Sequence, residues 1–133
     1  MTMDASGMFY VANSNNTVSK ITSNGIFTTL GTIWRNPSYI TIDTTSNVYT
    51  ENYNDNTVSM ITFSGVSNIL RSTGSFPGMI TVDGSGNVYT INNGSNIVSH
   101  ITVAVVSILA FANMGSGPVD ITNDAYGNIY TAN

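Results

Sequence analysis

Apolar and polar residues alternate in short blocks along this chain, and residues 40–52 form a representative block. The run 40–42 is β-branched or apolar, the segment 43–47 consists of turn-forming residues, and residues 48–50 return to strand composition. β-Branched and aromatic residues favour strands, and two such runs joined by turn residues are typical of a hairpin. The pattern therefore predicts a β-hairpin over residues 40–52.

The same thirteen-residue pattern occurs four times, beginning at residues 1, 40, 80 and 121. Its aspartates lie 39, 40 and 41 residues apart, and its tyrosines keep the same intervals: Asp4, Asp43, Asp83 and Asp124; Tyr10, Tyr49, Tyr89 and Tyr130. Periods of roughly 40 to 45 residues built from short strands are typical of propeller blades. The repeat thus predicts a propeller-like array.

A second hairpin is predicted in each unit, because residues 16–22 recur at 56–62 and 96–102 and are followed by a turn and a further apolar run. Val18 and Ile21 are an odd number of residues apart, so strict alternation places them on opposite faces. We expect both faces of each sheet to be covered by neighbouring blades. The third copy has lost the turn glycine at 103–106, and we expect a distorted turn there.

Prolines mark the boundaries between units. Pro37, Pro77 and Pro118 each precede a new first strand, where we expect a linker between sheets rather than a ladder position. The predicted fold class is all-β: a β-propeller of four-stranded antiparallel blades, about three and a half per chain, closed by oligomerisation. We expect one array over residues 1–133, with repeats at 1–36, 37–76, 77–117 and, in part, 118–133.

The first turn of each unit has a specific chemistry. An aspartate at its start can accept hydrogen bonds from backbone N–H groups two or three residues on. Gly7, Gly86 and Gly127 supply the position that tolerates positive φ, and where Ser46 replaces them we expect the following Asn47 to take that role. One carboxylate per turn is far fewer than the six to eight oxygens of a calcium site, so we expect ordinary turns.

Charge and composition exclude several partners. Only 8% of residues are charged, the net charge is −4, and the cations are Lys20, Arg35 and Arg71. Phosphate backbones require clustered basic residues, so we expect no nucleic-acid partner. The longest apolar run, 103–112, is too short to cross a bilayer, and no signal peptide is predicted at the start. Without cysteine, the sequence indicates neither a disulfide framework nor a compartment.

Several spaced blocks recur together: D-x-x-G-N-V-Y-T-x-N, N-x-V-S-x-I-T and the proline that opens each unit. With these blocks the whole chain resembles NHL-type β-propeller repeats, in particular arrays similar to streptogramin lyase. The resemblance implies the propeller fold. Propellers of this type include binding scaffolds, lactonases and lyases, so the fold alone does not specify the chemistry. The lyases work with histidine and glutamate side chains and a bound magnesium on one propeller face.

Two residues could belong to such a set. His100 is the only histidine and takes the repeat position of Lys20 and Met60, and Glu51 is the only glutamate. No partner that would orient a general base stands near either in sequence. We expect an exposed strand histidine and a solvated strand end, neither of them catalytic. The sequence thus predicts no catalytic, cofactor-binding or metal-binding residues.

Aromatic residues fall into two groups. The four repeated tyrosines are predicted to pack between blades, with their hydroxyls satisfying backbone groups. Five further aromatics do not follow the repeat and lie in or beside predicted connections: Trp34, Tyr39, Tyr53, Phe76 and Tyr126. Most such residues pack between blades, although a binding face built from loops would also use them.

Two functions follow from this pattern. The preferred one is a non-enzymatic scaffold or binding module that self-assembles from partial propellers. The alternative is a lyase- or lactonase-type enzyme whose site is formed across chains in the central tunnel. An open arc exposes apolar end faces, so we expect a homo-oligomer, with a homodimer of six or more blades favoured. A simpler explanation of the three and a half blades is that the chain is a fragment of a longer propeller. No ligand is indicated.

Overall fold

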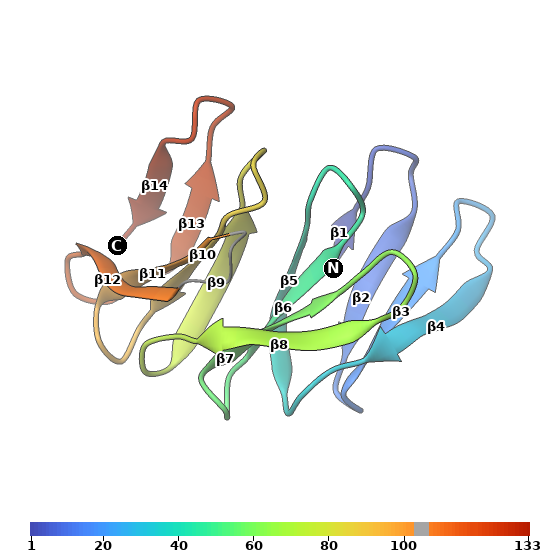
Figure 1. Cartoon of the computed structure of the whole chain (residues 1–133), viewed down its shortest axis with the longest axis horizontal. Coiled ribbons are helices and arrows are strands. Elements are labelled where there is room, and N and C mark those ends of the chain that lie inside the picture. Colours follow the sequence, from blue (N-terminus) through green and yellow to red (C-terminus); the bar gives the residue numbers. More distant parts are fainter. Residues whose placement is uncertain (103–106) are drawn as a thin grey trace.

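The chain folds into β-strands joined by short turns (Figure 1). The structure is a computed structural model that describes residues 1–102 and 107–133, and no helix occurs among them, so none there could span a membrane. The distorted turn expected at 103–106 lies outside the described residues. The strands are β1 Thr2–Met3, β2 Phe9–Asn13, β3 Thr17–Ile21, β4 Phe27–Thr32, β5 Pro37–Ile42, β6 Val48–Asn52, β7 Thr57–Ile61, β8 Ser67–Ser72, β9 Pro77–Val82, β10 Val88–Asn92, β11 Ile97–Ile101, β12 Ser107–Asn113, β13 Asp120–Asn123 and β14 Ile129–Ala132.

The strands form three four-stranded sheets and one two-stranded sheet. Sheet one contains β1–β4, sheet two β5–β8, sheet three β9–β12 and sheet four β13–β14, each a meander in chain order with antiparallel pairs. The first strands are neighbours, because β5 contacts both β1 and β9, and β9 contacts β13. They form the inner edge of the arc. The all-β partial propeller predicted from the repeat is confirmed.

Apolar clusters between successive sheets form the core. Ile61 packs in one cluster with Tyr10 and Val18 of sheet one, whereas Val58 packs in the next with Val88 of sheet three. Two residues of β7 at odd spacing therefore cover opposite faces of one sheet, as predicted. Full burial of each aliphatic side chain contributes about 1.5–3 kcal/mol to the free energy of folding. Packing against the neighbouring sheets therefore stabilises each sheet.

The aspartate turns are built from backbone and side-chain hydrogen bonds. Oδ1 of Asp43 accepts from the N–H groups of Thr45 at 2.8 Å and Asn47 at 2.9 Å, and Oδ2 accepts from the Tyr49 hydroxyl at 2.9 Å. Burial raises the pKa of Asp43, but these bonds and that of the Asn47 side chain outweigh it, so the pKa lies below its ordinary value. The turn prediction is confirmed, with the second N–H donor four residues on.

Two local expectations about these turns are wrong. Ser46 itself adopts the left-handed conformation, with φ of 64°, and Asn47 instead directs its amide to Asp43. The repeated tyrosines bind the turn carboxylate rather than a backbone group. Both differences have the same cause. The Asp43 carboxylate accepts hydrogen bonds from the Asn47 side-chain amide and the Tyr49 hydroxyl, so neither group is left for the role predicted for it.

Asparagine side chains tie each sheet to the connection that follows it. Oδ1 of Asn56 accepts from the N–H of Phe76 at 3.1 Å, and Oδ1 of Asn16 accepts in the same way from Asn36 at 3.0 Å. The predicted role of the prolines is corrected here. Pro37 and Pro77 are the first residues of β5 and β9, opposite Asn52 and Asn92, a position where a missing N–H is tolerated.

Candidate functional site

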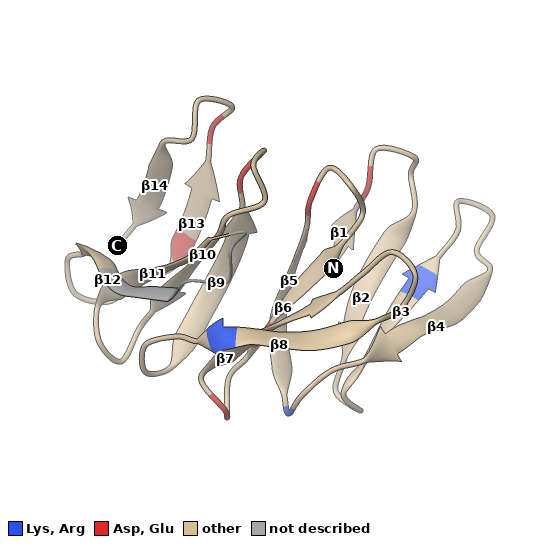
Figure 2. Ribbon diagram, in the orientation of Figure 1, with Lys and Arg blue, Asp and Glu red and all other residues tan. Residues whose placement is uncertain are grey.

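The two ends of the sheets are chemically different. The end that carries the aspartate turns is called the Asp rim, and the end with the connections before Pro37, Pro77 and Pro118 is called the Pro rim. Figure 2 shows acidic turns along one edge, whereas the three basic residues lie on different segments: Lys20 on β3, Arg35 in the connection before β5 and Arg71 on β8. The described residues thus form no basic patch, and the absence of a nucleic-acid partner stays a prediction.

Glu51 is fully buried in the centre of sheet two. It lies on β6, which pairs with β5 on one side and β7 on the other, and its exposed fraction is 0%. Tyr49, two residues earlier on the same face of β6, packs against Val88 of sheet three. Alternation therefore directs Glu51 into the interface between sheets two and three. The predicted solvated strand end is wrong, because β6 is an interior strand covered by the next sheet.

The Glu51 carboxyl is poorly satisfied. The Ser38 hydroxyl donates to Oε2 at 3.3 Å, and Oε1 has no hydrogen-bond partner among residues 1–102 and 107–133. Burial raises the pKa of Glu51 to about 9, and the Ser38 bond lowers it only in part. The group is therefore a neutral carboxylic acid at pH 7. A buried, poorly paired acid is costly, and such groups cluster at functional sites.

Ser38 connects this acid to the surface. It lies on the inner strand β5, directly after Pro37 at the Pro rim, and its side chain is exposed. Tyr39 follows it and is also exposed. A buried proton donor is thus one hydrogen bond away from an exposed hydroxyl on the strand that forms the inner edge of the arc.

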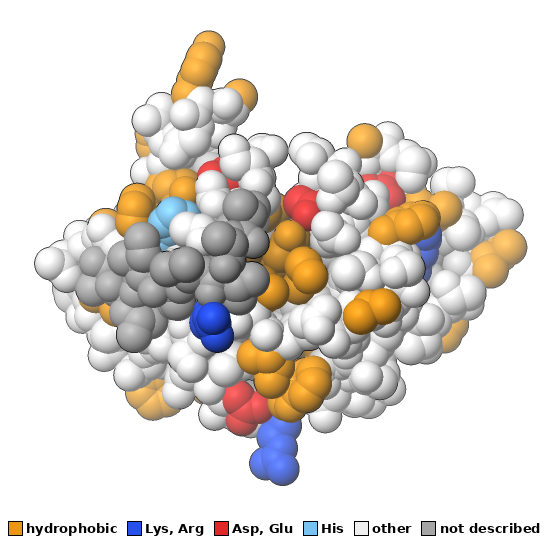
Figure 3. All heavy atoms as spheres, in the orientation of Figure 1, with side chains coloured by type: hydrophobic (Ala, Val, Ile, Leu, Met, Phe, Trp, Pro, Cys, Tyr) orange, Lys and Arg blue, Asp and Glu red, His pale blue; other side chains and the backbone are white. Residues whose placement is uncertain are grey.

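An aromatic pair lies close to Glu51 along the chain and at the same rim. The rings of Tyr53 and Phe76 are 5.7 Å apart, and both residues are exposed. Phe76 is anchored on both sides: its N–H donates to Asn56 of sheet two, and its carbonyl accepts from the Asn93 N–H at 2.9 Å. Figure 3 shows hydrophobic side chains at the lower edge, where connections between sheets lie in Figure 1. Exposed, fixed aromatic rings suit an apolar or flat ligand.

Phe76 adopts a conformation that bulky residues avoid. Its φ is 49°, at a position where the other units have Asn36 with φ of 57° and Gly117 with φ of 71°. A bulky residue in this region costs on the order of 1 kcal/mol or more. Gly94 lies against the ring, since a Cβ there would be 2.4 Å from Cδ2 of Phe76. The chain therefore has an exposed phenylalanine with a strained backbone at a position where Asn or Gly would adopt the same φ at lower cost.

His100 is half-buried and lies at the other rim, on β11. Its ring stacks on Tyr89 with centroids 4.5 Å apart, and neither ring nitrogen has a hydrogen-bond partner among the described residues. Burial lowers the pKa of His100, and the charge of Asp83 opposes that shift. The predicted exposed histidine is thus corrected, because the repeat position packs on the tyrosine of the neighbouring strand. Lys20 occupies the same position beside Tyr10.

The structure does not bring His100 and Glu51 together, because they face different sheet interfaces at opposite rims. Of the other aromatics, Trp34 is exposed in the connection at the Pro rim, and Tyr126 is exposed in the turn of sheet four at the Asp rim. Blade packing, expected for most of them, therefore does not describe these side chains. Tyr10, Tyr49 and Tyr89 are buried as predicted, whereas Tyr130 is 53% exposed because no sheet among the described residues covers the outer face of sheet four.

The residues of this chain do not fit the magnesium ion that the lyase resemblance implies. No three His, Asp or Glu side chains converge within the described ranges. The turn carboxylates are already saturated by their own donors, and Glu51 is neutral and buried. No step is therefore assigned to a metal here, and the predictions of no metal and no cofactor stay untested.

Comparison with solved structures identifies proteins with the same fold. Selenomethionine-substituted virginiamycin B lyase from Staphylococcus aureus matches with a TM-score of 0.79 and 22% identity, over 98% of this chain and 46% of that one. A catalytically inactive variant of the same lyase with quinupristin gives 0.75 and 22%, over 98% and 53%. A streptogramin B lyase gives 0.72 and 19%, over 98% and 52%. The chain thus spans about half the length of these structures.

No protein-family model matches the chain, and no curated protein sequence matches it. The solved structures confirm the predicted resemblance to streptogramin-lyase-like propellers at the level of the fold. They contradict the expectation that the chain is not an enzyme, because three solved structures that share its fold over 98% of its length are of lyases. The expectation rested on a single histidine and a single glutamate in a chain that spans about half the length of those enzymes.

Proposed function

We propose that this chain supplies about half of a lyase-type β-propeller enzyme, with the site at the Pro rim of sheets two and three. The observation that carries the proposal is the match over 98% of this chain to about half of each lyase. That fold carries groups that could take part in a reaction: the buried acid Glu51, its contact Ser38 and the aromatic pair Tyr53–Phe76. Neither half of a ring would need to hold the complete catalytic set.

A second copy of the chain is the proposed source of the remaining blades. Tyr10, Tyr49 and Tyr89 are each covered by the next sheet, whereas Tyr130 is exposed at the end of the arc. At the other end, Met3 is 56% exposed although its repeat equivalent Ile42 packs into a core cluster. These faces have the composition of the covered interfaces, so the outer face of sheet four suits the outer face of sheet one in a partner. A homodimer with six or more blades results.

The chemistry proposed for this chain's own residues is proton donation. An elimination breaks a C–H bond and a bond to a leaving group, and the departing atom needs a proton. For donation, the Ser38 hydroxyl must turn from Oε2 of Glu51 to the leaving group; the O–H of Glu51, neutral at pH 7, then passes its proton to Ser38 Oγ as the Ser38 hydroxyl proton moves to the leaving group. The base that removes the carbon-bound proton is assigned to the complementary half of the ring. Tyr53 and Phe76 would hold an apolar part of the substrate beside Ser38.

Quinupristin is the substrate to test first, because it accompanies one of the matched lyases. Purified protein is incubated with quinupristin, the products are separated, and their molecular masses are measured by mass spectrometry. Elimination leaves the summed product mass equal to that of the substrate, whereas hydrolysis adds one water. Turnover with unchanged summed mass supports the proposal, and no turnover by a closed, folded ring contradicts it.

A further inference from the structure

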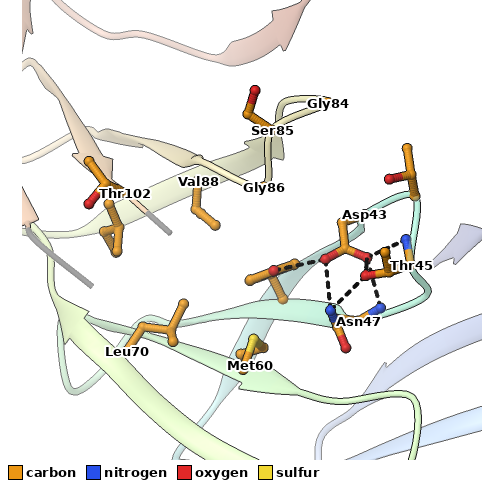
Figure 4. Close-up of a pocket in the computed structure, with 13 residues that line it drawn as sticks. Asp43, Thr45, Asn47, Met60, Leu70, Gly84, Ser85, Gly86, Val88 and Thr102 are labelled. Atoms are coloured by element: carbon orange, nitrogen blue, oxygen red, sulfur yellow. Dashed lines mark hydrogen bonds between the residues drawn. The ribbon is translucent and has the colours of Figure 1, made fainter. Parts of the chain in front are cut away.

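A cavity of about 330 Å³ opens at the Asp rim between sheets two and three (Figure 4). Glu51 is not among the residues that line it. Its apolar wall is formed by Met60 and Leu70 of sheet two and by Val88 and Ile101 of sheet three. Residues of two turns line the mouth: Asp43, Thr44, Thr45 and Asn47 from one, and Gly84 to Gly86 from the other. The volume falls at the lower end of the range for small-molecule sites.

Two residue differences distinguish this interface from the preceding one. In the preceding interface, Met8 packs against the core and the Lys20 ammonium lies 4.4 Å from the Phe63 ring centroid. The equivalent residues of sheet two are Asn47 and Met60. Asn47 turns its amide to Oδ2 of Asp43 at 2.9 Å, and Met60 is uncharged. The cavity therefore lacks both the packed methionine and the fixed cation that the preceding interface has.

Two aspartates stand at the cavity: Asp43 lines it, and Asp83 directly precedes the lining turn that begins at Gly84. Hydrogen bonds outweigh burial at Asp43 and Asp83 and hold the pKa of both carboxyls below the ordinary value, so both are ionised at pH 7. No Lys or Arg occurs among the described residues that line the cavity. A positive charge at the mouth would interact favourably with these carboxylates, and the hydroxyls of Thr44 and Ser85 could accept its hydrogen bonds.

We propose that this cavity binds a small organic amine, with its apolar body against Met60, Leu70 and Ile101 and its ammonium at the mouth beside Asp43. The internal precedent is Lys20, whose ammonium occupies the equivalent region of the preceding interface. The site is separate from the proposed catalytic rim and from its substrate. Its occupation would be a second binding function of the propeller.

Calorimetric titration with phenethylamine, and with phenylacetate as the anionic counterpart of similar shape, tests the charge preference. Phenethylamine is expected to bind at least about tenfold more tightly than phenylacetate, a difference of about 1.4 kcal/mol. Equal affinity for the two probes, or no binding of phenethylamine, would overturn the proposal.

Met60→Lys tests the location, because it transfers the residue of sheet one into the cavity and sheet one already tolerates a lysine there. The variant is expected to lose phenethylamine binding while keeping the melting temperature within a few degrees. The matched control is Lys20→Met, which makes the reverse change in the preceding interface and should leave binding unchanged. Should Met60→Lys fail to fold, Leu70→Trp fills the same space, with Ile69→Trp at an exposed neighbouring position as its control. Undiminished binding by a folded filling variant would place the amine elsewhere and refute the site.

Discussion

The Ser38 hydroxyl donates a 3.3 Å hydrogen bond to Oε2 of Glu51, which joins an exposed residue of the inner strand β5 to a fully buried acid of β6. The other carboxyl oxygen has no partner among the described residues. Packing alone does not favour this arrangement, because Ala12 and Ile91 fill the same position in other units with apolar side chains. The contact therefore distinguishes sheet two from its repeats.

Glu51 should make the protein less stable as the pH rises. Its folded pKa of about 9 lies above the ordinary 4.5, so the unfolded chain loses this proton first and unfolding is favoured through that window. Relative to Glu51→Gln, the free energy of unfolding of the unchanged protein should fall by up to about 1.4 kcal/mol per pH unit between those values. Urea titrations across that range measure the slope. Asp55→Asn, at an exposed turn of the Pro rim, should keep the original slope; parallel curves for Glu51→Gln would disprove the buried neutral acid.

The Asp–Tyr bond should contribute to stability where it is buried. Tyr49→Phe removes a 2.9 Å bond to Asp43 inside the sheet interface and should lower the free energy of unfolding by about 1–3 kcal/mol. Tyr130→Phe removes a bond of the same length in the fourth sheet, which is exposed in the single chain, and at concentrations where the chains are separate it should cost less than about 0.5 kcal/mol. Chemical denaturation compares the two variants. Equal losses would show that burial does not set the strength of this bond.

The strain at Phe76 can be separated from the loss of its ring. Phe76→Asn and Phe76→Leu both remove the contact with Tyr53, but Asn tolerates a φ of 49° far better than Leu. The Asn variant should therefore be more stable than the Leu variant by about 1 kcal/mol. Melting curves of the two variants test this difference. A Leu variant as stable as the Asn variant would remove the argument that the backbone is strained there.

The repeat pattern was sufficient to predict the sheets, the aspartate turns and the burial of Tyr10, Tyr49 and Tyr89, because each recurs at equal spacing and local turn chemistry does not depend on distant contacts. It could not predict the environment of Glu51. Burial of that residue depends on which sheet covers β6, and a single departure from the repeat resembles a tolerated surface change. A signal was present, since the equivalent positions hold Ala or Ile and are therefore apolar.

The positive φ of Phe76 could not be predicted from the sequence either. A phenylalanine before a proline is expected in an extended conformation, whereas the N–H bond to Asn56 and the preceding connection hold it at positive φ. Asn36 and Gly117 at the equivalent positions were the available clue, because both residue types tolerate that conformation. The non-enzymatic expectation is contradicted by the lyases that share the fold. Under the closure proposed above, a site shared between two halves of a ring would leave no complete motif in either half.

Closure by a second copy predicts a particle of two chains in solution, measured by light scattering at micromolar concentration. Tyr130→Lys places a charge on the uncovered face of sheet four and should shift the particle toward a single chain. Tyr126→Lys changes a residue in the turn that precedes β14, which is 93% exposed, and should leave the mass at two chains. A stable single chain for the unchanged protein would contradict this mode of closure.

The most direct test of the central claim is turnover of quinupristin by the two-chain particle, followed by mass spectrometry. The account predicts products whose summed mass equals that of quinupristin, with kcat lowered about 100-fold or more in Glu51→Gln and in Ser38→Ala and unchanged in Asp55→Asn. Absence of turnover by a particle confirmed to contain two folded chains, or full activity of both Glu51→Gln and Ser38→Ala, would contradict it.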